Sequence, residues 1–197
     1  FDRKLINNYS EFSRSFLRVR AEDLKKEIDD HYDDGHFWPE PLLSINPAFE
    51  HGPSANALAD DGVLAQETAR IFSINGQPLR FHAHQGEAIA KATRGQSYVV
   101  TTGTGSGKSL CFFVPIVDRA VRAKLAKQSP RTRAIIVYPM NALANSQMQE
   151  IEKFVGESGL PEELRPTVAR YTGQEDDTER RRVAANPPDI LLTNFMM

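Results

Sequence analysis

The stretch that most constrains the fold is residues 101–109, which read Thr-Thr-Gly-Thr-Gly-Ser-Gly-Lys-Ser. The apolar, β-favouring residues 97–100 precede it, and the apolar residues 110–114 follow it. This pattern predicts a buried strand, a glycine-rich turn and a helix that begins near Gly-Lys-Ser. Such a turn lets several backbone N–H groups point at one anion, and the helix N-terminus adds partial positive charge. The stretch therefore predicts a phosphate-binding P-loop.

The same stretch carries the side chains that a nucleoside triphosphate needs. In a P-loop the lysine reaches the β/γ-phosphates, and the hydroxyl of the next residue holds Mg²⁺. We therefore expect Lys108 and Ser109 to be catalytic, with Ser109 as the Mg²⁺ ligand. The expected nucleotide-binding residues of the loop are Gly103, Thr104, Gly105, Ser106, Gly107, Lys108 and Ser109. Thr102 stands where the common pattern has its first glycine, so the alternative is a surface loop that happens to contain Gly-Lys-Ser.

A glutamine lies on a predicted helix before the P-loop. Phe81, Gln85, Ala88 and Ala92 recur at helical spacing and share one face. A carboxamide on this apolar face offers a donor and an acceptor, which match the N6/N7 edge of adenine. We therefore expect Gln85 to bind the nucleotide. The alternative is a glutamine whose polar atoms are satisfied by nearby backbone.

Strands and helices alternate after the P-loop. The predicted strands are residues 134–138, 166–171 and 189–193, and the predicted helices are residues 108–127, 141–154 and 178–185. This order predicts an α/β fold with a parallel sheet covered by helices on both faces. Such sheets bind ligands at the carboxyl ends of their strands. That rule brings the P-loop and residues 139–141, 172–173 and 193–194 to one edge.

These segments, taken together, resemble the first RecA-like lobe of a superfamily 2 helicase of the DEAD/DEAH-like kind, over residues 79–197. The matching segments are His84-Gln85 with residues 87–89 (Q motif), residues 102–109 (motif I), residues 138–143 with Gln147 (motif Ia), residues 171–173 (motif Ib) and Thr193-Asn194 (a later strand-end motif). Residues 101–109 and 139–147 are most similar to large bacterial helicases with a C-terminal DUF1998 domain. One of these is the helicase of the DISARM phage-defence system.

The resemblance implies an ATP-dependent helicase or translocase that uses Mg²⁺. Its expected track is nucleic acid, with DNA favoured over RNA, and its expected setting is phage defence or DNA repair with a protein partner from such a complex. In this family the strand-end motifs contact the sugar-phosphate backbone. The corresponding residues are Asn141, Ser146, Gln147, Thr172, Gly173, Thr193 and Asn194. For Asn141 the alternative is a plain helix N-cap.

Two other functions stay open from the sequence. One is a P-loop NTPase acting on a small molecule, and the other is a nucleotide-binding scaffold without motor activity. The Asp-Glu box of motif II and a second lobe do not occur in these 197 residues. We therefore expect a lobe truncated before motif II, inactive by itself.

The part of the chain before the P-loop differs in its residue pattern. Residues 1–34 carry helical spacing with mixed charges, and glycines and prolines interrupt residues 35–77. We expect an N-terminal extension over residues 1–77, mainly helical, and a RecA-like P-loop NTPase domain over residues 78–197. The net charge of −2 shows no overall basic excess, so nucleic-acid contacts would be local. No signal peptide is visible and no apolar run approaches the ~20 residues that span a membrane, so we expect a cytoplasmic protein without membrane contact.

Overall fold

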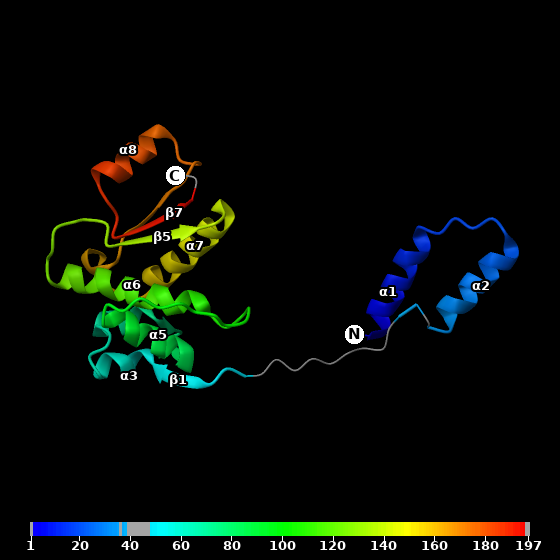
Figure 1. Cartoon of the computed structure of the whole chain (residues 1–197), viewed down its shortest axis with the longest axis horizontal. Helices are drawn as coiled ribbons and strands as arrows, with labels where there is room; N and C mark the ends of the chain where they lie inside the picture. The colour runs from blue at the N-terminus through cyan, green and yellow to red at the C-terminus, as the bar shows by residue number, and fades with distance from the viewer. Residues whose placement is uncertain (1, 36, 39–47, 196–197) are drawn as a thin grey trace. The chain divides into compact units, whose positions relative to one another are not determined.

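The computed structural model of the chain describes residues 2–35, 37–38 and 48–195 (Figure 1). The chain divides into two compact units, Phe1–Pro47 and Ala48–Met197. The sequence analysis placed the start of the nucleotide-binding domain at residue 78, whereas the second unit begins at Ala48. Within the described residues, every helix is too short or too polar to span a membrane.

The first unit contains helices α1 (Asp2–Ser15) and α2 (Glu22–Asp33). Arg14 joins them: its guanidinium donates to Asp33 Oδ1 at 2.9 Å and lies 4.7 Å from the centre of the Tyr32 ring. No residue of α2 is buried, as the mixed charges of its sequence predict. The prediction of a helical N-terminal region is confirmed.

The second unit begins with short elements that pack against the helix after the P-loop. In order they are β1 (His51–Ser54), α3 (Ala55–Asp60), α4 (Gln66–Ile71), β2 (Ser73–Ile74), β3 (Gln77–Pro78), β4 (Arg80–His82) and α5 (Ala83–Thr93). β1 pairs antiparallel with β4, and β2 pairs antiparallel with β3. Leu58, Leu64 and Phe72 share one hydrophobic core with Phe113 and Val117 of α6 (Lys108–Leu125). This shared core is why residues 48–77 fold with the domain.

A buried carboxylate also ties this segment to α6. Asp118 accepts hydrogen bonds from the Ala65 N–H at 2.7 Å, the Thr68 hydroxyl at 2.8 Å and Arg122 Nε at 2.6 Å. Ala65 and Thr68 lie at the start of α4, so one side chain of the P-loop helix fixes the position of that helix.

The remaining elements form a parallel sheet with its helices. They are β5 (Ala134–Tyr138), α7 (Asn141–Glu157), the 3-10 helix η1 (Glu162–Leu164), β6 (Val168–Tyr171), α8 (Asp177–Ala185) and β7 (Ile190–Asn194). The strand order is β5-β7-β6, and both pairs are parallel. In Figure 1 the strands lie between α8 and α6. The α/β fold with a parallel sheet is confirmed.

The prediction of a strand directly before the P-loop is wrong. Residues 97–100 form no strand, and Val99 is 87% exposed. An apolar run becomes a strand only where another strand pairs with it, and no described strand pairs with this one. Instead the Tyr98 hydroxyl anchors the run to α6 by donating to the Cys111 carbonyl at 2.7 Å.

Helices cover the two faces of the sheet unequally. α7 packs against all three strands, whereas α8 packs mainly against β6. On β5, Ile136 and Tyr138 are therefore buried, while Ile135 is 62% and Val137 is 46% exposed on the opposite face. The prediction of helices over both faces holds for β6 but not for β5 among the described residues.

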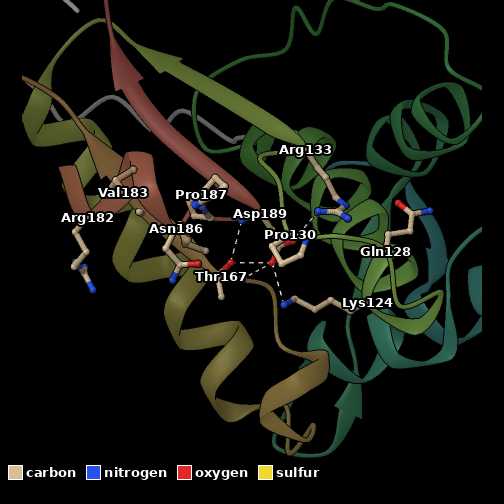
Figure 2. A pocket seen from close by; sticks show the side chains of 13 residues that line it. Lys124, Gln128, Pro130, Arg133, Thr167, Arg182, Val183, Asn186, Pro187 and Asp189 are labelled. Carbon is tan, nitrogen blue, oxygen red and sulfur yellow. Dashed lines mark hydrogen bonds and ion pairs between the residues drawn. The ribbon is translucent and has the colours of Figure 1, made fainter. Parts of the chain in front are cut away.

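One carboxylate holds the amino ends of the three strands together (Figure 2). Asp189 Oδ2 accepts from the backbone N–H and the hydroxyl of Thr167, both at 2.9 Å. Arg133 lies 3.3 Å from Asp189 Oδ1, and Lys124 of α6 lies 3.2 Å from Oδ2. These residues line a cavity of about 440 Å³ at the edge of the sheet opposite the predicted strand-end motifs.

Candidate nucleotide and nucleic-acid sites

The P-loop lies directly before the N-terminus of α6, as the sequence predicts. α6 begins at Lys108, and Gly107 caps it with a left-handed φ of +69°. This backbone conformation favours glycine, and a Cβ atom at Gly107 would lie 2.5 Å from Gln85 Nε2 and so would displace the Gln85 carboxamide. The exposed Gly103, Thr104 and Gly105 form the outer part of the loop.

Lys108 and Ser109 occupy the first two positions of α6. Their backbone N–H groups belong to the helix terminus, where no intrahelical acceptor exists. Lys108 Nζ donates to the carbonyl oxygens of Thr102 at 2.9 Å and Gly103 at 2.6 Å, so it lies over the mouth of the loop. This donor set fits a triphosphate with Mg²⁺ on the Ser109 hydroxyl. Their binding here stays a prediction.

Thr102, the departure from the common motif, bonds across the loop. Its hydroxyl lies 2.6 Å from the Ser106 hydroxyl, and Ser106 is buried. The Ser106 carbonyl accepts from His84 Nε2 at 3.0 Å. The side chain of Ser106 is thus directed into the loop, and its predicted role with the nucleotide would come from its backbone.

Gln85 is buried, with only 2% of its surface exposed, and contacts the P-loop directly. Its Oε1 accepts from the His82 N–H at 2.8 Å, and its Nε2 donates to the Gly107 carbonyl at 2.8 Å. These are the backbone contacts that the sequence analysis kept as the alternative for this residue. They make Gln85 a bridge between the start of α5 and the turn that precedes Lys108. A contact with adenine stays a prediction.

The carboxyl ends of β5 and β7 meet through two predicted site residues. Asn141 Oδ1 accepts a hydrogen bond from Asn194 Nδ2. Met140 is the N-cap of α7 and Asn141 is its first residue, so Asn141 is not the plain N-cap of the alternative interpretation. Thr193 lies beside this pair and is half-buried. The rule that strand ends converge therefore holds for β5 and β7.

Thr172, at the end of β6, is fully buried and bound to a carboxylate that the sequence analysis missed. Its N–H and hydroxyl donate to Glu175 Oε2 at 2.5 and 2.8 Å. Arg170 donates from Nε to the other oxygen of Glu175 and from a terminal nitrogen to Asn145 of α7. Burial acts to raise the pKa of Glu175, but the hydrogen bonds from Thr172 and Arg170 hold that pKa below its usual range.

The other predicted nucleic-acid residues lie close by in sequence but outside these two contacts. Gly173 and Ser146 are exposed. Gln147 Nε2 donates to Glu150 at 3.2 Å, one turn further along α7. The structure therefore brings together Asn141 with Asn194, and Thr172 with Arg170, Asn145 and Glu175.

Comparison with known proteins agrees with this geometry. A family model described as DEAD/DEAH box helicase matches residues 82–196. Among curated proteins, the Druantia protein DruE of Escherichia coli (strain UMEA 4076-1) is 32% identical over 157 residues, which are 72% of this chain and 8% of that protein.

Two solved structures share the fold. The helicase Lhr of Mycobacterium smegmatis, bound to ssDNA and AMP-PNP, matches with 26% identity and a TM-score of 0.56, over 68% of this chain and 17% of that one. The DUF1998 helicase MrfA, bound to DNA and AMPPNP, matches with 22% identity and a TM-score of 0.62, over 82% and 21%. The chain therefore spans only a small part of each relative: 8% of DruE, 17% of the Lhr chain and 21% of the MrfA chain.

Proposed function

Because this chain belongs to the DEAD/DEAH box helicase family, we propose that it forms the first RecA-like lobe of an ATP-driven motor that acts on DNA. The observation that carries the proposal is the P-loop at the N-terminus of α6, with Lys108 over its mouth and Gln85 bonded behind it. An intact phosphate cradle coupled to the preceding helix favours nucleotide turnover over a scaffold that only retains the fold.

Each residue of the cradle has a separate task in this proposal. The N–H groups at the start of α6 bind phosphate oxygens, and Lys108 neutralises charge on the phosphoryl group that is transferred. The Ser109 hydroxyl holds Mg²⁺, which bridges phosphate oxygens and offsets the charge that develops on them. Gln85 keeps the carbonyl of Gly107 fixed and so holds the turn that aims these donors.

The carboxyl edge of the sheet supplies the proposed track. Its donors are neutral amides and hydroxyls on Asn141, Thr172 and Asn194, together with the amide of Gly173. Such groups bind phosphates without reading bases. The structures of Lhr and MrfA are bound to DNA, which supports DNA as the nucleic acid. A role in phage defence or DNA repair, with a protein partner, rests on the resemblance to DUF1998-bearing helicases.

The activity test uses the full-length protein. We expect its ATP hydrolysis to be stimulated by single-stranded DNA more strongly than by RNA of the same sequence, and to support separation of DNA strands. Phosphate release measures ATP hydrolysis, and a strand-displacement assay measures the separation of DNA strands. A rate of ATP hydrolysis that neither DNA nor RNA raises would instead favour an NTPase that acts on a small molecule. Nucleotide binding without hydrolysis would favour the scaffold.

Gln85→Ala tests the two tasks of the glutamine. Removing a buried side chain that satisfies two backbone groups costs about 1–3 kcal/mol, so we expect ATP affinity to fall about tenfold. If Gln85 also contacts adenine, the unsubstituted protein prefers ATP over GTP and the substitution narrows this preference. If Gln85 only holds the loop, both affinities fall equally. Calorimetric titration with each nucleotide distinguishes these outcomes.

Gln77→Ala is the matched control, because Gln77 is exposed in β3. We expect it to leave both affinities unchanged. Unchanged ATP affinity in Gln85→Ala itself would contradict the role of this residue in the nucleotide site.

A further inference from the structure

The turn between β6 and α8 places a carboxylate among phosphate-binding groups. We propose that Arg170, Thr172 and Arg180 form a binding site for one backbone phosphate of single-stranded DNA, and that Glu175 occupies this site until the phosphate displaces it. The inference rests on the proposed function and adds a regulatory step to it.

The donors around Glu175 are those that proteins use for phosphate. Thr172 contributes a backbone N–H and a hydroxyl, both directed at Oε2, and Arg170 contributes its guanidinium to Oε1. Backbone amides, hydroxyls and arginines are the common partners of nucleic-acid phosphates. The Glu175 carboxylate therefore fills the place of a tetrahedral anion.

A second cation, Arg180, lies beside this cluster and has a donor that is not used. Arg180 of α8 contacts the Thr172 carbonyl at 3.5 Å, and its buried Nε has no partner among the described residues. Its ion pair with the exposed Asp177 is long, at 3.9 Å. With Glu175 displaced, two arginines and the Thr172 donors would surround the site, and this donor set suits the singly charged oxygens of a phosphodiester.

The chain around Glu175 allows it to leave without unfolding its neighbours. Glu175 lies in the turn that follows Gly173 and Gln174, outside β6 and α8. α8 is capped separately, because Asp176 Oδ1 accepts from the Glu179 N–H at 2.8 Å. Asn145 holds Arg170 from the side of α7, so Arg170 keeps its place when Glu175 leaves.

The experiment measures binding of labelled oligo(dT) by the full-length protein. Glu175→Gln keeps the size of the side chain and removes its charge, so the phosphate no longer competes with a carboxylate. We expect affinity to rise several-fold. The double variant Glu175→Gln with Arg170→Gln is expected to lose this gain, because the phosphate then lacks the Arg170 guanidinium.

Glu163→Gln is the charge-matched control. Glu163 is exposed in η1, before the amino end of β6, so it lies away from the site. An equal gain from this variant would show a general charge effect and overturn the inference. A fall in affinity with Glu175→Gln would show that Glu175 only positions Thr172 and Arg170, and would also overturn it.

A second measurement uses the unsubstituted protein and does not depend on how the variants fold. Carbodiimide labelling of Glu175 is expected to increase when oligo(dT) saturates the protein, because the displaced carboxylate enters solvent. Labelling that stays constant or falls would refute displacement. If the unsubstituted protein does not bind oligo(dT) at all, the proposed function fails together with this inference, whereas binding without displacement overturns the inference alone.

Discussion

The full-length protein with Lys108→Ala is expected to hydrolyse ATP about 10²-fold more slowly, or worse, than the unsubstituted protein. Catalysis of phosphoryl transfer depends on positioning and on neutralising charge that develops on the phosphoryl oxygens. In the proposed site Lys108 is the cation that contacts those oxygens, and its Nζ is bonded to the carbonyls of Thr102 and Gly103 at the same loop. Release of phosphate at saturating ATP and DNA measures the effect.

The loss should be catalytic rather than structural. Among the described residues the Lys108 side chain is bonded only to the carbonyls of Thr102 and Gly103, whereas the buried core of α6 begins at Cys111 and Phe113. Lys108→Ala is therefore expected to keep the melting temperature of the unsubstituted protein. Lys153→Ala, an exposed lysine in α7, is the control and should retain full activity. Hydrolysis by Lys108→Ala near the normal rate would refute the assignment of the P-loop.

Local sequence was sufficient where an element is determined by its own residues. β5 and the start of α7 lie at the predicted residues, because an apolar β-branched run ends at Pro139 and a helical pattern begins at Asn141. The turn before Lys108 was predictable for the same reason. Its two left-handed residues, Gly105 and Gly107, are glycines, which adopt this conformation readily.

Sequence failed where the outcome depends on a partner elsewhere in the chain. The run 97–100 has the composition of a strand, but composition does not say which strand pairs with it. The domain boundary expected at residue 78 was likewise inferred from local composition alone. Glycines and prolines suggested an irregular extension, yet Leu58 and Phe72 pack against α6 in the core of the second unit.

The three buried carboxylates were also missed, because isolated acidic residues have no characteristic spacing. Asp118 accepts from Thr68, and Asp189 from Thr167, across 50 and 22 residues of chain. Only Asp118 left a signal, since it is a single acid in the apolar face of α6. Glu175 is close to its partners in sequence, but exposed and buried acids look alike in a polar turn.

Asp189→Ala is expected to destabilise the protein by about 3–5 kcal/mol, the usual cost of removing one partner from a buried ion pair. The Arg133 and Asp189 side chains are nearly inaccessible, at 5% and 7% exposed. Without the carboxylate, Arg133 keeps a buried charge, and the N–H and hydroxyl of Thr167 lose their acceptor. Denaturant unfolding followed by circular dichroism measures the change in the free energy of unfolding.

The position of Asp189 makes the effect extend over the whole sheet. Its carboxylate joins the residues before β5 and β6, its own backbone carbonyl accepts from the N–H groups of Arg133 and Ala134, and Lys124 connects it to α6. Asp177→Ala is the control, because that aspartate is exposed and its ion pair is long. We expect this variant to unfold like the unsubstituted protein. If Asp189→Ala also unfolded like the unsubstituted protein, the prediction would be wrong. Apolar contacts alone would then hold β5, β6, β7 and α6 together.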